Sequence, residues 1–177
     1  MNSQEFIVSI AKLKPSLKEL SRPDYDNELV NIWLNYFEIS TIKLTQAIDD
    51  PIVNLIKCND ISLLDVNGIT FDPNLNEHEE YIFFGWDSND RLAIQKSNKK
   101  IVSYDSYSCR IMFECADNSS RFLDALVEIM KFFREKILAN YEEEERDKRG
   151  AKVAYICALK AGGEQYEDYY KSILWIE

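Results

Sequence analysis

Residues 1–60 carry apolar side chains at the spacing of amphipathic helices. One apolar stripe predicts a helix over residues 3–20, which Pro15 kinks or restarts because proline interrupts helical hydrogen bonding. A second stripe predicts a helix over residues 29–37, and Asp49-Asp50-Pro51 has the capping aspartate and first-turn proline of a helix start. Residues 39–48 show no clear period. We therefore predict a helical N-terminal part with one undecided segment.

Between residues 61 and 116 the pattern changes to short runs rich in β-branched and aromatic residues, which predict strands. These runs are residues 61–66, 69–71, 80–86, 91–95, 100–105 and 109–115. Asn67-Gly68 and Asn98-Lys99 suit hairpin turns. Because no helical pattern separates the runs, we expect an antiparallel meander of about five or six strands. Its expected core positions are Phe83 or Phe84, Leu92, Ile94, Ile101 and Val102, and Gly85 is expected to permit a tight strand end.

Residues 117–177 return to helical patterns. The polar run 117–120 precedes a strong amphipathic stripe over residues 122–133, and residues 151–161 predict a further helix that Gly162-Gly163 ends. Residues 164–175 predict a last helix. We interpret YEEEERDKRG, residues 141–150, as a solvated helix end and loop. The chain is thus expected to form a single α+β domain over residues 1–177, with helices in 1–60 and 117–177 and the sheet in 61–116.

Charge changes the range of expected partners. The 177-residue chain has a formal net charge of -10, which disfavours direct binding to nucleic acid because such binding needs basic residues to neutralise phosphates. The first explanation of the negative charge is that it only keeps the protein soluble, and the alternative is that it serves binding to a basic protein. The chain lacks a signal-peptide pattern and an apolar run of about 18 residues, so we expect a cytoplasmic protein with no membrane partner. The oligomeric state stays open.

Candidate chemistry is sparse. The chain contains one histidine, His78, in a polar stretch, which disfavours Ser-His-Asp and Cys-His catalysis. The four cysteines are scattered without a CxxC pair, and no phosphate-binding glycine motif is present. We therefore expect no catalytic residues, metal or cofactor, and no enzymatic activity. Asp87 and Asp90 are interpreted as turn residues, and Glu142 to Glu145 as a solvated face, with an interaction surface as the alternative.

The order of elements in FFGWDSNDRLAIQKSNKKIVSYD, residues 83–105, resembles the central signature of the SMI1/KNR4 (SUKH) superfamily. That signature is a strand closing in Phe-Gly, a polar loop, a Leu-Ala-Ile-like strand and a strand with Val and Asp. ECADNSSRFLDALVEIM is similar to the helix entry that follows it in the family, through Ala116, Ser120, Phe122, Leu123 and Leu126. ALKAGGEQYEDYYKSIL is similar to a C-terminal extension of some bacterial members. The family's N-terminal segment is matched only by Arg22-Pro23-Asp24-Tyr25 and Asn67-Gly68, and the loop after Gly85 lacks the customary glycines.

The resemblance implies an immunity-type protein that neutralises a cognate bacterial toxin, often a nuclease, by stoichiometric binding. The implied partner is a basic toxin domain. The alternatives are a regulatory or scaffolding protein that binds endogenous partners, as in fungal relatives, and a small hydrolase with a pocket of Asp and Tyr. The hypothetical partner-binding residues are Trp86, Asp87 and Asp90 at the rim of the sheet, together with Glu142, Glu143, Glu144 and Glu145.

Overall fold

The structure is a computed structural model that describes residues 1–21, 25–42, 48–88, 90–139 and 142–176. Its fold is α+β, as the sequence predicts. The helices are α1 (Ser3–Leu13), α2 (Leu17–Leu20), α3 (Asn27–Asn35), α4 (Pro51–Cys58), α5 (Ser119–Leu138), α6 (Glu143–Ala161), the 3-10 turn η1 (Glu164–Tyr166) and α7 (Glu167–Leu174). The strands are β1 (Ser40–Thr41), β2 (Asn59–Asp60), β3 (Asp65–Val66), β4 (Ile69–Glu77), β5 (Tyr81–Asp87), β6 (Asp90–Gln95), β7 (Ile101–Asp105) and β8 (Arg110–Ala116).

The N-terminal helices begin where the sequence places capping residues. Asn2 and Ser16 each form a capping box, so α2 restarts the helix after Pro15, as predicted. The side chain of Asp50 accepts hydrogen bonds from the first turn of α4, which has Pro51 in its first position. Most of the undecided segment 39–48 and the Arg22-Pro23-Asp24 part of the family-like segment lie outside the described residues.

The predicted meander is confirmed as a six-stranded antiparallel sheet in the order β3-β4-β5-β6-β7-β8, and β1 and β2 form a separate pair. Asn67 and Gly68 both have positive φ angles, as their hairpin turn requires. The strand predicted over residues 61–66 is wrong except for Asp65–Val66. There the chain turns instead, because the Asp60 side chain binds Ser62 and the Leu64 amide donates to the Ile61 carbonyl.

The described part of the acidic segment, residues 142–150, is not a helix end and loop, because α6 already begins at Glu143; Tyr141 lies outside the described residues. Carboxylates in the first turn stabilise the positive end of the helix dipole. Ion pairs one turn apart support the same segment: Glu144 with Lys148 at 2.6 Å and Glu145 with Arg149 at 2.8 Å. Local charge pairing therefore extends a helix whose exposed half has no apolar stripe. The helix ends at Ala161, followed by Gly162, as predicted.

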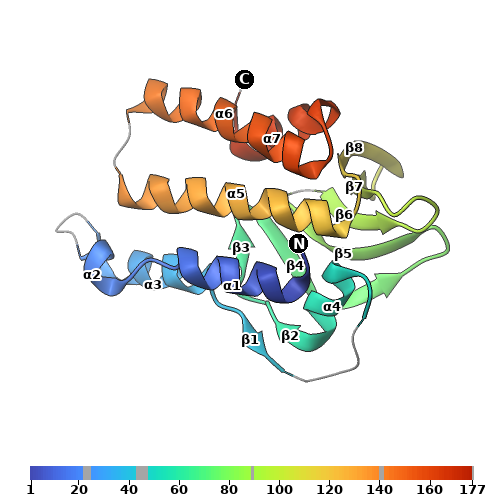
Figure 1. The fold of residues 1–177 in the computed structure, drawn as a ribbon, viewed down its shortest axis with the longest axis horizontal. Coiled ribbons are helices and arrows are strands. Elements are labelled where there is room, and N and C mark those ends of the chain that lie inside the picture. The colour runs from blue at the N-terminus through green and yellow to red at the C-terminus, as the bar shows by residue number, and fades with distance from the viewer. Residues whose placement is uncertain (22–24, 43–47, 89, 140–141, 177) are drawn as a thin grey trace.

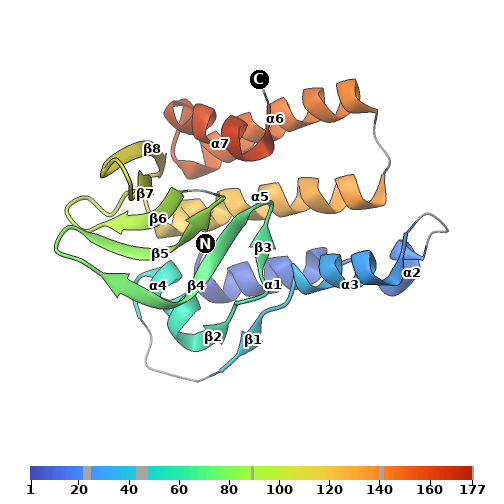
Figure 2. The ribbon, with the colours of Figure 1, turned by 180° about the vertical axis from the view of Figure 1, so that it is seen from behind.

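Helices pack on one face of the sheet. Helix α5 lies between α1 and α6, while α4 packs against β4 and α7 against β8 (Figures 1 and 2). One apolar core joins this helical layer to the sheet, and we call the sheet face that it covers the inner face. The inner-face core includes the predicted residues Phe84, Leu92, Ile94 and Ile101, whereas Phe83 and Val102 point to the opposite face.

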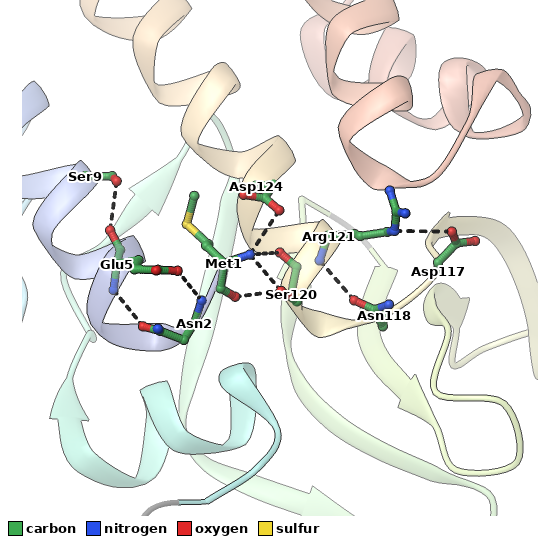
Figure 3. Close-up of polar contacts among 9 residues, drawn as sticks. All are labelled: Met1, Asn2, Glu5, Ser9, Asp117, Asn118, Ser120, Arg121 and Asp124. Atoms are coloured by element: carbon green, nitrogen blue, oxygen red, sulfur yellow. Dashed lines mark hydrogen bonds and ion pairs between the residues drawn. The ribbon is translucent and has the colours of Figure 1, made fainter.

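Polar contacts attach the start of α1 to the start of α5 (Figure 3). The amino group of Met1 lies 2.7 Å from Ser120 Oγ and 3.0 Å from Asp124 Oδ2. The side chain of Asn118 caps α5 by accepting a hydrogen bond from the Arg121 amide at 3.1 Å. The contacts of Met1 hold the starts of α1 and α5 together within the helical layer.

Candidate functional site

The face of the sheet opposite the main core, here called the outer face, carries its own apolar cluster. Phe83, Ala93 and Val102 form its centre, with Tyr81 and Tyr104 packed against them. Successive residues of a strand point to opposite faces of the sheet, so the strand neighbours of the inner-face core residues point to the outer face. The elements that pack on the inner face contribute no residue to this cluster. The outer face is therefore an aromatic surface in its own right.

An open cavity of about 480 Å³ lies on the outer face. This volume falls in the range of about 300–1,000 Å³ that is typical of ligand pockets. Strands β4 to β7 and the connections at their ends supply its lining, which consists of Asn76, His78, Glu79, Glu80, Tyr81, Phe83, Trp86, Arg91, Tyr104 and Ser106. We call this cavity the outer-face pocket.

Arg91 forms part of the pocket wall. Its guanidinium carbon lies 4.4 Å from the centroid of the Trp86 ring and 5.4 Å from that of Phe83. Asp72 binds both wall residues: Arg91 Nη2 donates to Oδ2 at 2.6 Å, and the indole N–H of Trp86 donates to Oδ1 at 3.2 Å. Most of the charge of Arg91 is thereby compensated inside the wall. Its Nε atom is buried and has no hydrogen-bond partner among the described residues.

Two irregularities in the sheet bring these residues together. The β4–β5 register shifts between Phe71 and Asn76, in the stretch that carries Asp72, and the β5–β6 register shifts between Phe83 and Gly85. Such shifts re-aim side chains next to functional sites. A Cβ atom on Gly85 would lie 2.1 Å from the Thr70 carbonyl oxygen, so a glycine is needed where the two strands approach. Gly85 is thus an interior residue of β5 and not the strand end expected from the sequence.

The aromatic side chains of the pocket contact one another. The ring centroids of Tyr81 and Tyr104 lie 5.2 Å apart, and those of Phe83 and Tyr104 lie 5.6 Å apart. His78 is exposed, in agreement with its expected place in a polar loop, and its ring meets the edge of Phe83 at 5.3 Å. The strands therefore hold several ring faces around one cavity.

Carboxylates lie at the edge of this aromatic wall. Glu79 and Glu80 are both exposed, and neither side chain forms an ion pair with a described residue. Partial desolvation raises the pKa of the Tyr104 phenol, and the nearby charge of Glu80 is among the neighbours that raise it further. The lining thus combines open aromatic rings with uncompensated negative charge.

Trp86 and Asp87 are consecutive, but the strand directs them to different faces. The Trp86 side chain is exposed on the outer face, whereas Asp87 is buried among residues of the sheet and α7. Burial raises the pKa of Asp87 to about 6, against the opposing effect of the Ser103 hydroxyl. The two residues therefore do not form one exposed rim patch, although each stays a hypothetical contact residue.

The surroundings of Asp87 hold further titratable groups. Burial raises the pKa of the Cys115 thiol and of the Tyr169 phenol, and the charge of Asp87 raises both further. The hydroxyl groups of Ser103 and Tyr169 are buried without a hydrogen-bond partner in the described part of the chain, although both lie close enough to Asp87 to lower its pKa. A neutral thiol is a poor nucleophile, so this cluster is poorly suited to covalent chemistry.

Asp90 begins β6 and pairs with Asp87 across the turn. Strand β5 ends at Asp87 and Ser88 has a positive φ of 59°, so the predicted turn between the two aspartates is confirmed; Asn89 lies outside the described residues. Desolvation raises the pKa of Asp90, and the charge of Asp105 adds to this effect. Asp90 is half-buried, and it lines a smaller cavity of about 210 Å³ that also contains Asp87.

The structure does not bring the four predicted glutamates to the outer-face pocket. Glu142 stands directly before α6 without a capping hydrogen bond from its side chain to a described residue, Glu143, Glu144 and Glu145 lie in the first turn, and all four are exposed. The start of α6 lies at the end of the helical layer that points away from β5 to β8 (Figures 1 and 2). These residues are therefore a separate acidic surface, and their partner-binding role stays a prediction.

Most of the pocket was not predicted. Tyr81, Phe83, Arg91 and Tyr104 lie in predicted strands but were not among the candidate contact residues, and Asp72, which supports the wall, lies just beyond the predicted strand 69–71. The signal that could have identified them is the continuous apolar run YIFFGW in β5. A strand that covers a core on one side only should alternate apolar and polar residues, so an unbroken run indicates that both faces are covered or bind something.

Among the described residues, no group of three or more His, Cys, Asp or Glu side chains is placed to hold a metal ion. The described helices include none that is long and apolar enough to cross a membrane. Comparisons with protein-family models, with curated proteins and with solved structures found no match to this chain. The conclusions about the site therefore depend on its own geometry and charge.

Proposed function

We propose that this chain is an immunity-type binding protein of the SMI1/KNR4 (SUKH) kind, which neutralises a cognate bacterial toxin by stoichiometric binding. The single observation that carries the proposal is the aromatic outer face of the sheet. It presents Tyr81, Trp86, Arg91 and Tyr104 around an open cavity that the inner-face elements do not fill. Trp, Tyr and Arg are the residue types that contribute most to binding energy at protein interfaces.

The rigidity of this face supports a binding role. Each of these side chains projects from a paired strand, and the contacts of Asp72 orient Trp86 and Arg91 before any partner arrives. A surface that is already ordered loses little conformational entropy on binding. The overall charge of -10 would in addition speed the encounter with a basic partner such as a nuclease domain.

The chemistry of the candidate groups also favours binding over catalysis. The side chain of His78 has no hydrogen bond to a hydroxyl or thiol group in the described residues, as an activated nucleophile would require. The cluster around Asp87 contains a thiol and a phenol whose pKa values are raised by burial. These properties support a protein that acts by occlusion.

The order of the elements agrees with the family resemblance. The segment similar to the SUKH signature, residues 80–133, forms β5, β6, β7, β8 and most of α5 in direct succession. Membership of the family is part of the proposal, and so is a cytoplasmic site of action, where an immunity protein would meet its toxin.

Co-expression with the toxin encoded beside this gene tests the proposal. We expect rescue of growth and a one-to-one complex that survives size-exclusion chromatography. Failure of both with every neighbouring toxin would refute the proposal. Co-purification of housekeeping proteins, with no toxin gene adjacent, would instead favour the regulatory or scaffolding alternative.

A further inference from the structure

We propose that the outer-face pocket binds a lysine or arginine side chain of the partner protein. This inference rests on the proposed function and specifies how the partner is recognised. The pocket is large enough, at about 480 Å³, to admit a long side chain together with the backbone that carries it. The chemistry of the lining decides which side chain it is.

The aromatic rings provide the first argument. The faces of aromatic rings carry partial negative charge and attract cations that lie within about 6 Å of the ring centroid. In this pocket Tyr81, Phe83 and Tyr104 contact one another as neighbours, with centroids 5.2 to 5.9 Å apart. Arg91 already uses the same interaction with Trp86 inside the protein. A second cation fits the remaining ring surface by the same physics.

The distribution of charge provides the second argument. Arg91 is the cation of the lining, but its guanidinium group is paired with Asp72 and its side chain is only 16% exposed. Glu79 and Glu80, in contrast, are exposed and form no ion pair with a described residue. A cation that enters the pocket therefore meets two carboxylates that form no ion pair with a described residue. An entering carboxylate would meet the same two glutamates and would be repelled.

The charge of the whole chain points the same way. A net charge of -10 produces a negative potential that concentrates basic partners and disfavours acidic ones. A protruding Lys or Arg would thus be drawn to the surface by long-range attraction and held in the pocket by short-range contacts.

Nuclear magnetic resonance titration of the whole chain with N-acetyl-arginine amide and N-acetyl-lysine amide tests the assignment. The reporter is the indole N–H of Trp86, identified by its loss in a Trp86→Phe variant. We expect a saturable shift with both probes and none with N-acetyl-glutamate amide. The double variant Glu79→Gln, Glu80→Gln should weaken binding at least about threefold, as expected for the loss of a partly exposed ion pair. Glu28→Gln, a neutral change at an exposed position of α3 outside the pocket, should leave the affinity unchanged.

Three results would overturn the assignment. The first is binding of the glutamate probe as tight as that of the basic probes, and the second is an unchanged affinity in the double variant. The third is a far tighter saturable shift with choline, because a preference for a free quaternary ammonium group would identify a small-molecule site. Folding of each variant is checked independently by its amide spectrum.

Negative results of the toxin experiment and of the titration refute different proposals. If the basic probes bind but no neighbouring toxin is neutralised, the pocket assignment stands and the immunity function falls. If a toxin complex forms but the basic probes do not bind, the immunity function stands and the pocket assignment falls. When both succeed, the Glu79→Gln, Glu80→Gln variant should also weaken the toxin complex.

Discussion

The guanidinium group of Arg91 lies against the indole ring of Trp86, with 4.4 Å between Cζ and the ring centroid. Asp72 accepts hydrogen bonds from both side chains, so one carboxylate on β4 orients an aromatic residue of β5 and a cation of β6. A cation–π contact of this kind contributes about 0.5–2 kcal/mol, depending on its exposure to water. The wall of the outer-face pocket is thus ordered by contacts within the protein itself.

Asp72→Ala should destabilise the protein and disorder this wall. The change leaves Arg91 without its ion-pair partner and Trp86 without its hydrogen-bond acceptor. Losing a hydrogen bond to a charged group costs about 1.5–3 kcal/mol. Urea unfolding measures the loss, and the indole N–H resonance of Trp86 should shift and broaden.

The control for Asp72 is Glu144→Ala, which removes the exposed ion pair with Lys148 on α6. Exposed pairs one helical turn apart contribute only about 0.3–0.5 kcal/mol. If Asp72→Ala costs no more than this control, the contacts of Asp72 do not stabilise the wall.

Gly85→Ala should be strongly destabilising. The new Cβ atom would lie 2.1 Å from the Thr70 carbonyl oxygen, and a strand backbone cannot move away without breaking the β4–β5 pairing. We expect a loss on the order of 1–3 kcal/mol or more, as in other overpacked sites. Thermal unfolding followed by circular dichroism gives the difference from the unmodified protein.

Gly150→Ala is the matched control, because Gly150 is also buried but lies in α6. There the nearest atom to a new Cβ is the terminal methyl of Ile176, at 2.5 Å, which can rotate away. Alanine also favours a helix over glycine by about 1 kcal/mol. A loss at Gly150 as large as that at Gly85 would contradict the explanation from strand approach.

The neighbouring tyrosines of α7 should respond differently to loss of their hydroxyl groups. The hydroxyl of Tyr170 donates to the buried carbonyl oxygen of Cys115 at 2.9 Å, so Tyr170→Phe should cost about 1–3 kcal/mol. The hydroxyl of Tyr169 has no hydrogen-bond partner among the described residues, so Tyr169→Phe should change stability by less than about 0.5 kcal/mol. Chemical denaturation compares the two variants. A large cost for Tyr169→Phe would mean that its hydroxyl donates to Asp87 in solution.

The burial of Asp87 should make stability depend on pH. Its pKa is about 6 in the folded protein, against an ordinary value of 3.8, so the folded state holds this proton more tightly than the unfolded state. Stability therefore falls as the pH rises from about 4 to about 6 and stays lower above that range. Asp87→Asn should remove this loss and stabilise the protein at pH 7 by at most about 3 kcal/mol, and it should have no such advantage at pH 4. Unfolding at a series of pH values measures the difference.

Asp105→Asn serves as the control of opposite sign. Hydrogen bonds from the Ser108 side chain and the Tyr107 amide lower the pKa of Asp105, so its charged form stabilises the folded state above the ordinary pKa of a carboxyl group. The asparagine variant should therefore be less stable than the unmodified protein at pH 7. A stabilisation at Asp105, or none at Asp87, would contradict the proposed role of burial.

Elements determined by near neighbours in the chain were predictable. The helix restart after Pro15, the capping residue Asp50, the Asn67-Gly68 turn and the helix end at Gly162 depend on contacts within a few residues. The acidic start of α6 was mispredicted although part of its support is also local. Charge pairs one turn apart and the packing of its later half stabilise this helix, and a search for an apolar stripe does not detect either.

The candidate site was predictable only in part. Trp86 was selected as a contact residue, and it lies in the wall of the outer-face pocket. Asp87 was selected with it as part of the same rim, yet the alternation of the strand directs it into the interior. Asp72 lies 14 positions before Trp86 and 19 positions before Arg91, and it meets them across strand pairings that the sequence pattern does not specify.

The sequence by itself determined the succession of helices and strands, the antiparallel meander and the overall negative charge, because each depends on local spacing or on composition. Only the tertiary structure decided that Asp72, Trp86 and Arg91 form one unit, that Glu79 and Glu80 stand beside open aromatic rings, and that Asp87 is buried under α7. The physical reason is register. Shifts at Phe71–Asn76 and Phe83–Gly85 set which side chains share a face, and they depend on the close approach of β4 and β5 at Gly85.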